Sequence, residues 1–155
     1  QELGYDGGAF FSPDSKLLIF RASRPQTPQE VEEYQQLLSE GLVAPTRMEL
    51  FVCNLDGSGL RQITQLGGAN WAPYFHPDGQ RVIFSTNHHS KRGFPFNLFM
   101  VNLDGSGLRQ ITFDSTFDSF PMFSPDGRRL IFASNRRNGG TRDTNLILVD
   151  WVDRP

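Results

Sequence analysis

The chain has 155 residues, a mass of 17.5 kDa and a net charge of −2, which suits one domain with a buried core and does not favour nucleic acid as a partner, because phosphate binding normally goes with a basic excess. No apolar run approaches the ~18 residues of a membrane span, and the single cysteine, Cys53, excludes an internal disulfide. The 15 Gly, 10 Pro and 14 Phe indicate many turns between short aromatic-rich segments, as in an all-β chain.

The first predicted unit covers residues 5–66 and opens with the turn motif Phe11-Ser-Pro-Asp14, which precedes an apolar strand. Two further copies follow at intervals of 64 and 48 residues, and the 16 extra residues in the first interval indicate an insertion. The three motifs and their strands are Phe11–Asp14 with Leu17–Phe20, Phe75–Asp78 with Val82–Phe84, and Phe123–Asp126 with Leu130–Phe132.

The insertion, residues 25–47, is the one segment predicted to be helical, over about residues 28–40. Thr27 and Glu30 can form a capping box, and Gly41 is the expected stop. We expect the apolar stripe of this helix to pack on the body of the domain; a helix that docks a partner, or a lid over a channel, is the alternative. The stripe consists of Val31, Tyr34, Leu37 and Leu38.

A verbatim repeat establishes the period of the chain: Asn54–Thr64 recurs letter for letter at Asn102–Thr112, 48 residues later. The Asp-Gly-Ser-Gly turn inside each copy closes a hairpin between two strands. In the second unit, residues 69–114, four strands (a to d) are predicted over Ala72–Phe75, Arg81–Ser85, Leu98–Leu103 and Leu108–Thr112. Four antiparallel strands in about 48 residues is the period of a β-propeller blade, which a β-sandwich does not explain.

The third unit, residues 117–153, has strands a to c but no counterpart of strand d. The predicted fold is therefore an all-β β-propeller segment of three four-stranded blades, the last lacking its outer strand, with one helical insertion at about 28–40. Three blades do not close a ring. We expect the chain to be the C-terminal half of a ring of about six blades, with the remaining blades supplied by the same protein or by another chain.

These motifs resemble the repeat of TolB-like β-propellers: Phe-Ser-Pro-Asp-Gly, an apolar strand, Ala-Ser-Asn-Arg, Asn-Leu-Phe, Asp-Gly-Ser-Gly and Leu-Arg-Gln-Ile-Thr. The resemblance implies a protein-binding scaffold in the bacterial periplasm or another extracytoplasmic part of the cell envelope. The alternative is the gating propeller of a larger hydrolase, such as a prolyl-oligopeptidase-type peptidase. Because the chain has no Gly-x-Ser-x-Gly and no His-Glu-x-x-His motif, we expect it to be non-enzymatic.

Blade connectivity places the b–c loops and the connectors between blades on one face of the propeller. Asp6, Asn70 and Asp118 lie there, each eight residues before a turn aspartate, where strand a begins at the mouth of the central channel. Two interpretations remain open. Their oxygens could hold a cation such as Ca²⁺ or a partner's basic side chain, or they could cap backbone N–H groups of the connectors. No other cofactor is expected.

The b–c loops are rich in basic residues, which predicts a positive rim suited to an anionic peptide or a protein with an acidic patch; an ordinary solvated surface is the alternative. These residues are Arg24, Arg47, His88, His89, Arg92, Arg136, Arg137 and Arg142. The adjacent histidines lack an evident third ligand, so no metal is assigned to them. Purely structural roles in the turns are predicted for Asp14, Asp56, Asp78, Asp104 and Asp126.

Overall fold

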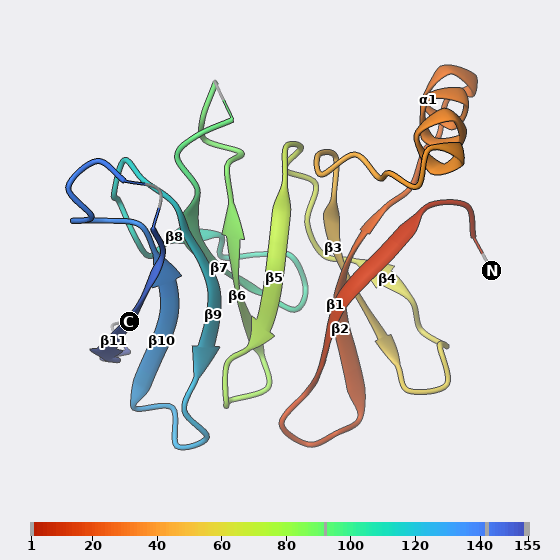
Figure 1. The fold of residues 1–155 in the computed structure, drawn as a ribbon. Helices are drawn as coiled ribbons and strands as arrows, with labels where there is room; N and C mark the ends of the chain where they lie inside the picture. The colour runs from red at the N-terminus through yellow and green to blue at the C-terminus, as the bar shows by residue number, and fades with distance from the viewer. Residues whose placement is uncertain (1, 92, 142, 154–155) are drawn as a thin grey trace.

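The structure, a computed structural model, describes residues 2–91, 93–141 and 143–153. Three antiparallel sheets stand side by side, and the first strands of neighbouring sheets pack together (Figure 1). The first blade has the strand order β1 (Tyr5–Phe11), β2 (Leu17–Ser23), β3 (Glu49–Asn54), β4 (Arg61–Gln62). The second has β5 (Asn70–Phe75), β6 (Arg81–Thr86), β7 (Asn97–Asn102), β8 (Arg109–Gln110). The third has β9 (Asp118–Phe123), β10 (Arg129–Ser134), β11 (Asn145–Asp150). The predicted propeller architecture is confirmed.

The outer strand β8 is shorter than the predicted Leu108–Thr112, and β4 is equally short, because a threonine hydroxyl replaces the backbone carbonyl as the hydrogen-bond acceptor. The ladder between β3 and β4 continues to Ile63, whose N–H donates to the carbonyl of Leu50 at 2.8 Å. The N–H of Leu50 then donates to the Thr64 hydroxyl, also at 2.8 Å. The same pair of bonds joins Ile111 and Thr112 to Leu98 in the second blade. The final threonine of each repeat therefore ends the strand.

The turn aspartates have the structural roles predicted for them. Asp56 accepts hydrogen bonds from the hydroxyl and the backbone N–H of Ser58, at 2.7 and 2.9 Å, and Asp104 accepts the same pair from Ser106. These hydrogen bonds hold the pKa of both carboxyls below its ordinary value. The remaining three accept from backbone N–H groups within their own turns: Asp14, Asp78 and Asp126.

Each innermost strand contains a bulge at an equivalent residue. Gly8, Ala72 and Phe120 have φ angles of 63°, 48° and 55°, in the left-handed region that favours glycine. The pairing of each of these strands with its neighbour shifts register at this point. Because Ala72 and Phe120 have Cβ atoms, the flanking ladder must hold them in a strained conformation.

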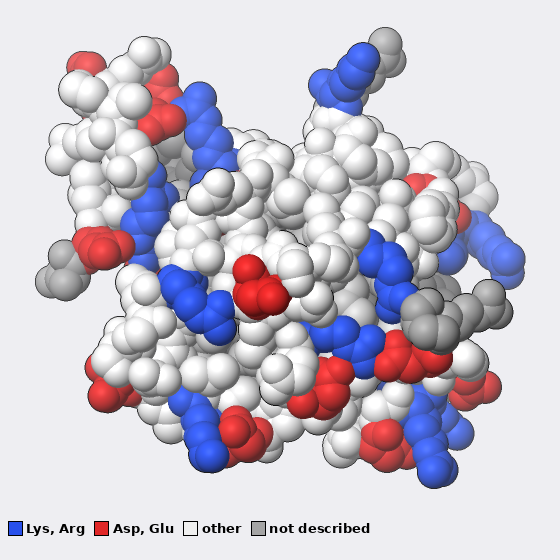
Figure 2. Space-filling model, turned by 180° about the vertical axis from the view of Figure 1, so that it is seen from behind, with Lys and Arg blue, Asp and Glu red and all other residues white. Residues whose placement is uncertain are grey.

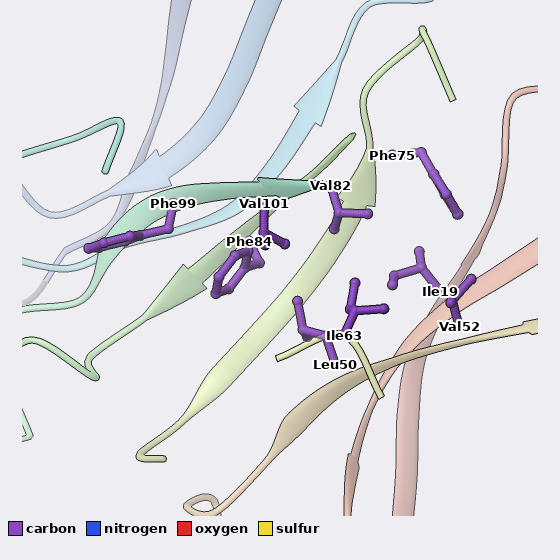
Figure 3. Close-up of a cluster of buried hydrophobic side chains, with 9 residues drawn as sticks. All are labelled: Ile19, Leu50, Val52, Ile63, Phe75, Val82, Phe84, Phe99 and Val101. Carbon is purple, nitrogen blue, oxygen red and sulfur yellow. The ribbon is translucent and has the colours of Figure 1, made fainter. Parts of the chain in front are cut away.

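The hydrophobic core lies between the blades rather than within them. Side chains alternate along each strand: Val82 and Phe84 of β6 face the first blade, whereas Ile83 faces the third. Figure 3 shows the cluster between the first two blades, where Phe84 lies with residues of both. The members of this cluster are Ile19, Leu50, Val52, Ile63, Phe75, Val82, Phe84, Phe99 and Val101.

Helix α1 (Pro28–Ser39) begins and ends as predicted, with a Thr27–Glu30 capping box and Gly41 at a φ of 74°. The expectation that its apolar stripe packs on the blades is corrected, because none of its residues is buried and it stands clear of the sheets (Figure 1). Tyr34 and Leu37 instead line an open pocket of about 210 Å³, whose other walls are residues 23–25 at the end of β2 and the return segment 43–47 of the same insertion. The Tyr34 hydroxyl donates to the Gly4 carbonyl at 2.8 Å, which ties the helix to the first blade. Among the described helices, none has the length and apolar character to cross a bilayer.

Thr27→Ala is expected to destabilise α1 by about 1 kcal/mol, because Thr27 Oγ1 accepts the Glu30 N–H at the N-cap. Hydrogen exchange of the α1 amides should accelerate about fivefold, while global unfolding in urea stays unchanged because no α1 side chain is buried. Thr27→Ser, which keeps the hydroxyl, is the control. A loss of global stability equal to the local loss would show that α1 is part of the core.

Candidate functional site

The candidate site lies on the face formed by the β2–β3, β6–β7 and β10–β11 connections and by the β4–β5 and β8–β9 connectors, here called the loop face. Figure 1 shows these segments and α1 at the top of the molecule. The β1–β2, β5–β6 and β9–β10 turns lie at the opposite end (Figure 1). Since β1, β5 and β9 start at the loop face, the three side chains predicted at the channel mouth lie there.

Two of these three side chains form ion pairs with an arginine 18 residues later in the chain. Asp6 Oδ1 accepts from Arg24 Nη2 at 2.5 Å, and its side chain is 52% exposed. Asp118 accepts from Arg136 Nη2, but its side chain is fully buried. In the second blade the same two positions hold Asn70 and His88. Blades 1 and 3 therefore each have an Asp–Arg ion pair at these two positions. Blade 2 has an asparagine and a histidine there, neither of which has a carboxylate.

Asn70 acts as a donor that fixes the connector between the first two blades. Its Nδ2 donates to the Met48 carbonyl at 2.7 Å and lies 3.2 Å from both Glu49 Oε2 and the Gly67 carbonyl. Its Oδ1 is buried and has no hydrogen-bond partner. The side chain thus accepts no backbone N–H.

The backbone N–H groups at the starts of the innermost strands are capped by different residues. The N–H groups of Tyr5, Ala69 and Phe117 donate at 3.2, 2.8 and 2.8 Å to the side chains of Ser23, Asn87 and Asn135. Ser23 is the last residue of β2, whereas Asn87 and Asn135 directly follow β6 and β10. The capping that was one of the two interpretations for Asp6, Asn70 and Asp118 is therefore done by residues at the ends of β2, β6 and β10.

A cation among Asp6, Asn70 and Asp118 stays a prediction, and the donor set gives it little support. Both aspartates are next to guanidinium groups, whose positive charge disfavours a second cation. Across residues 2–91, 93–141 and 143–153, no three His, Cys, Asp or Glu side chains are grouped so as to hold a metal ion. The His88 and His89 rings pack on each other and on Phe99.

Several of the predicted basic residues are neutralised by acidic neighbours. Arg24 contacts Glu2 as well as its aspartate, Arg47 lies 3.2 Å from Glu30, and Arg136 has Asp114 as a second, more distant partner at 3.9 Å. Figure 2 shows blue side chains lying next to red ones at several places on the surface seen from behind. Exposed side chains of the predicted rim are Arg47, His89 and Arg137, while Arg92 and Arg142 lie outside the described residues.

Glu49 is a residue of this face that the sequence prediction missed. Its Oε1 accepts the N–H groups of Leu66 and Gly67 at 3.0 and 2.7 Å, and its Oε2 accepts the Thr64 hydroxyl at 2.6 Å. The Glu49 carboxylate therefore holds Thr64, Leu66 and Gly67 of the β4–β5 connector in place. A usable signal was present, because a polar residue precedes the Leu-Phe or Leu-Ile pair in all three repeats.

A line of aromatic side chains crosses the loop face and was also missed. Trp71 stacks on Phe96 with ring centroids 4.7 Å apart, and Phe96 meets Phe117 at 5.5 Å. Phe117 in turn lies 6.5 Å from Phe120, the strained residue of β9. Arg21 lies at the other end, over the Trp71 ring. The Arg21–Trp71 and Phe96–Phe117 contacts join residues of different blades, so the line cannot be recognised from a single repeat.

His88 is expected to make the chain less stable in mild acid. Burial and the neighbouring His89 lower the pKa of His88 from its ordinary 6.5. Because the unfolded chain then binds this proton more tightly, the free energy of unfolding should fall as the pH drops below about 6.5. Urea unfolding at pH 7.5 and 5.5 measures the loss.

His88→Gln is the control and should largely remove this pH dependence. An unchanged acid response in His88→Gln would assign the effect to another group.

Comparison with known proteins gives one family and several partial matches. The model of the TolB beta propeller domain matches residues 43–142. Dipeptidyl-peptidase 5 of Porphyromonas gingivalis is 36% identical over 76 residues, 49% of this chain and 9% of the peptidase. A structure assigned to TolB of Agrobacterium tumefaciens has a TM-score of 0.68 at 23% identity, covering 97% of this chain and 47% of that one. TolB of Acinetobacter baumannii has a TM-score of 0.65 at 20% identity, with 93% and 29% covered. The chain thus spans less than half the length of each of these proteins.

Proposed function

Because the chain belongs to the TolB β-propeller family, we propose that it is the protein-binding part of a propeller scaffold and that its loop face makes the contact. The observation that carries the proposal is the asymmetry between the two faces. The turns of the opposite face repeat almost unchanged, whereas α1, the aromatic line and the exposed charged loops all differ between blades. A rigid scaffold that holds variable loops on one side is the usual arrangement for recognition.

A non-enzymatic role is part of the proposal. Cys53 is buried in β3, and burial raises the pKa of its thiol, which disfavours the reactive thiolate. His89 is engaged with Asn97 through a 2.9 Å contact between Nε2 and Oδ1. Neither group has the neighbours of an activated nucleophile among the described residues. A periplasmic or other extracytoplasmic location is proposed on the family membership.

The test compares the same change of charge on the two faces. Lys91→Glu with Arg137→Glu alters exposed loop-face residues, and Lys16→Glu with Arg128→Glu alters exposed residues of the opposite turns. With a photo-crosslinker at the loop face, the first variant should lose the crosslinked partner protein and the second should keep it. Retention of the partner by both variants would contradict the proposal.

A second candidate function is the gating propeller of a peptidase, favoured by the 36% identity to part of dipeptidyl-peptidase 5. The whole protein would then carry a hydrolase domain and cleave a chromogenic dipeptidyl substrate. In that case the loop-face variant should change kcat/KM with peptide length while the opposite-face variant does not. Absence of hydrolysis by the whole protein would leave the binding scaffold as the sole candidate.

We also propose that further blades, from the same protein or another chain, cover the open faces of the arc. Leu146 on β11 is 72% exposed, whereas the equivalent Leu50 and Leu98 are fully buried against the next blade. An exposed apolar face of this kind favours association. Light scattering is expected to give a mass above 17.5 kDa for the 155-residue chain alone; a stable monomer at high concentration would contradict this.

A further inference from the structure

Arg21 interrupts the repeat at the junction between the first two blades. It pairs across the sheet with Gly7, while the equivalent Ser85 pairs with Trp71. The Ser85 hydroxyl closes its own junction by donating to a backbone carbonyl of the third blade at 2.6 Å. The third equivalent, Ala133, is also small. The first blade therefore has a long, positively charged side chain opposite a glycine, at the position where the other two blades have a small side chain.

Two aromatic rings from different blades enclose this cation. The Arg21 guanidinium carbon lies 5.7 Å from the centroid of the Tyr5 ring and 5.8 Å from that of Trp71. Trp71 is held in place by its indole N–H, which donates to the Pro45 carbonyl at 2.9 Å, and by its stacking on Phe96. We call Arg21, Tyr5 and Trp71 the Arg21 cage.

The glycine opposite Arg21 is required by the cage. A Cβ atom at Gly7 would lie 2.3 Å from the Tyr5 hydroxyl oxygen, so the Tyr5 ring occupies the space that a larger residue would fill. The same hydroxyl lies 3.4 Å from Arg21 Nη2 and accepts its hydrogen bond. The contacts of Tyr5 and Trp71 therefore hold both rings in place before a ligand binds, and both residues belong to the described part of the chain.

The charge of Arg21 is not balanced within the described ranges, where no carboxylate lies within ion-pair distance of it. Its Nε is buried and has no acceptor, although buried donors are normally satisfied. Other arginines of the loop face differ from Arg21 in this respect, because Arg24, Arg47 and Arg136 each contact at least one carboxylate. Arg21 itself is only partly buried, so part of the residue has contact with solvent. The cage thus combines an unpaired cation with two fixed aromatic walls.

We propose that the Arg21 cage binds the carboxylate of an Asp or Glu side chain from the partner protein, with an apolar residue of the partner against the aromatic rings. A guanidinium offers a planar fork that matches one carboxylate, and one guanidinium balances one negative charge. The flanking rings favour a flat or apolar neighbour. This inference rests on the proposed protein-binding function and identifies Arg21 as the residue that anchors the partner protein.

The test uses the full chain and two blocked pentapeptides, Ac-Gly-Phe-Glu-Phe-Gly-NH2 and its Gln counterpart. The Glu peptide is expected to shift the Trp71 indole N–H signal in NMR and to bind at least about tenfold more tightly than the Gln peptide. Arg21→Gln should remove this preference, and Tyr5→Phe should weaken it. Lys16→Gln, which removes an exposed charge on the opposite face, should leave it unchanged.

Three results would overturn the inference: equal affinity for the two peptides, an unchanged preference in Arg21→Gln, or binding only of a peptide with a free C-terminal carboxylate, Ac-Gly-Gly-Phe-OH. The failure of the proposed function is a separate result. If the loop-face charge variant releases the crosslinked partner and Arg21→Gln does not, the scaffold function stands and the cage inference falls. If neither releases it, the scaffold function fails and the peptide titration alone decides the cage.

Discussion

Phe84→Ala is expected to lower the free energy of unfolding by about 3–5 kcal/mol, the usual range for truncating a buried aromatic residue. Phe84 is fully buried at the centre of the cluster between the first two blades, 6.4 Å from the ring of Phe99. The other side chains of the cluster are fixed on strands of two blades, so they cannot easily move into the cavity that the truncation leaves. A loss of this size is a large part of the total stability of a typical domain. Urea unfolding followed by tryptophan fluorescence measures it.

Leu148→Ala is the matched control for this change. Leu148 lies on the open face of the third blade and is 59% exposed, so its truncation should cost no more than about 0.5 kcal/mol at a protein concentration low enough for light scattering to show the monomer. The contrast tests whether stability comes from contacts between blades. Similar losses in both variants of the monomer would contradict the view that stability comes from contacts between blades.

Arg136→Ala is expected to cost about 3–5 kcal/mol, because it leaves the carboxylate of Asp118 buried without its cation. Asp118 is 0% exposed and its Oδ1 already lacks a partner, so the protein offers it no replacement. The free energy of unfolding of the variant, from urea titration at pH 7, is the measurement. Adding Asp118→Asn to Arg136→Ala should recover part of the loss by removing the buried charge.

Arg24→Ala tests the same contact in a different environment. Arg24 pairs with Asp6 at the equivalent position of the first blade, where the carboxylate is about half exposed. Water can solvate that carboxylate once the arginine is gone, so the expected cost is about 0–1 kcal/mol. Equal losses for Arg24→Ala and Arg136→Ala would mean that burial does not decide the strength of these pairs.

The features that could be predicted from the sequence are those set within a few neighbouring residues. The Thr27–Glu30 box, the stop at Gly41 and the turn aspartates depend on local backbone geometry, and the structure confirms them. The 48-residue period predicted the blades because each blade repeats the same local signals. Bulged residues such as Ala72 escaped prediction, because only the pairing on both sides maintains their left-handed backbone.

The candidate site was harder to predict because its contacts join distant segments. Asp6 and Asp118 were placed at the correct end of their strands, but the sequence does not show that an arginine 18 residues later is the partner. The environment of Arg21 depends on a ring from the neighbouring blade. Two residues of the apolar stripe of α1, Tyr34 and Leu37, face the return segment of the same insertion rather than a blade, which the sequence alone does not show.

The verbatim repeat has a consequence for how the chain finds its native pairing. The hairpins at Asn54–Thr64 and Asn102–Thr112 have the same residues and the same internal bonds, so each could pair with the strand of the other at little local cost. The short Asp-Gly-Ser-Gly turns prevent this within one chain by keeping each outer strand beside its own neighbour. Between two chains no such tether exists. During refolding at high concentration, the two repeated hairpins are therefore the segments that two molecules can most readily exchange.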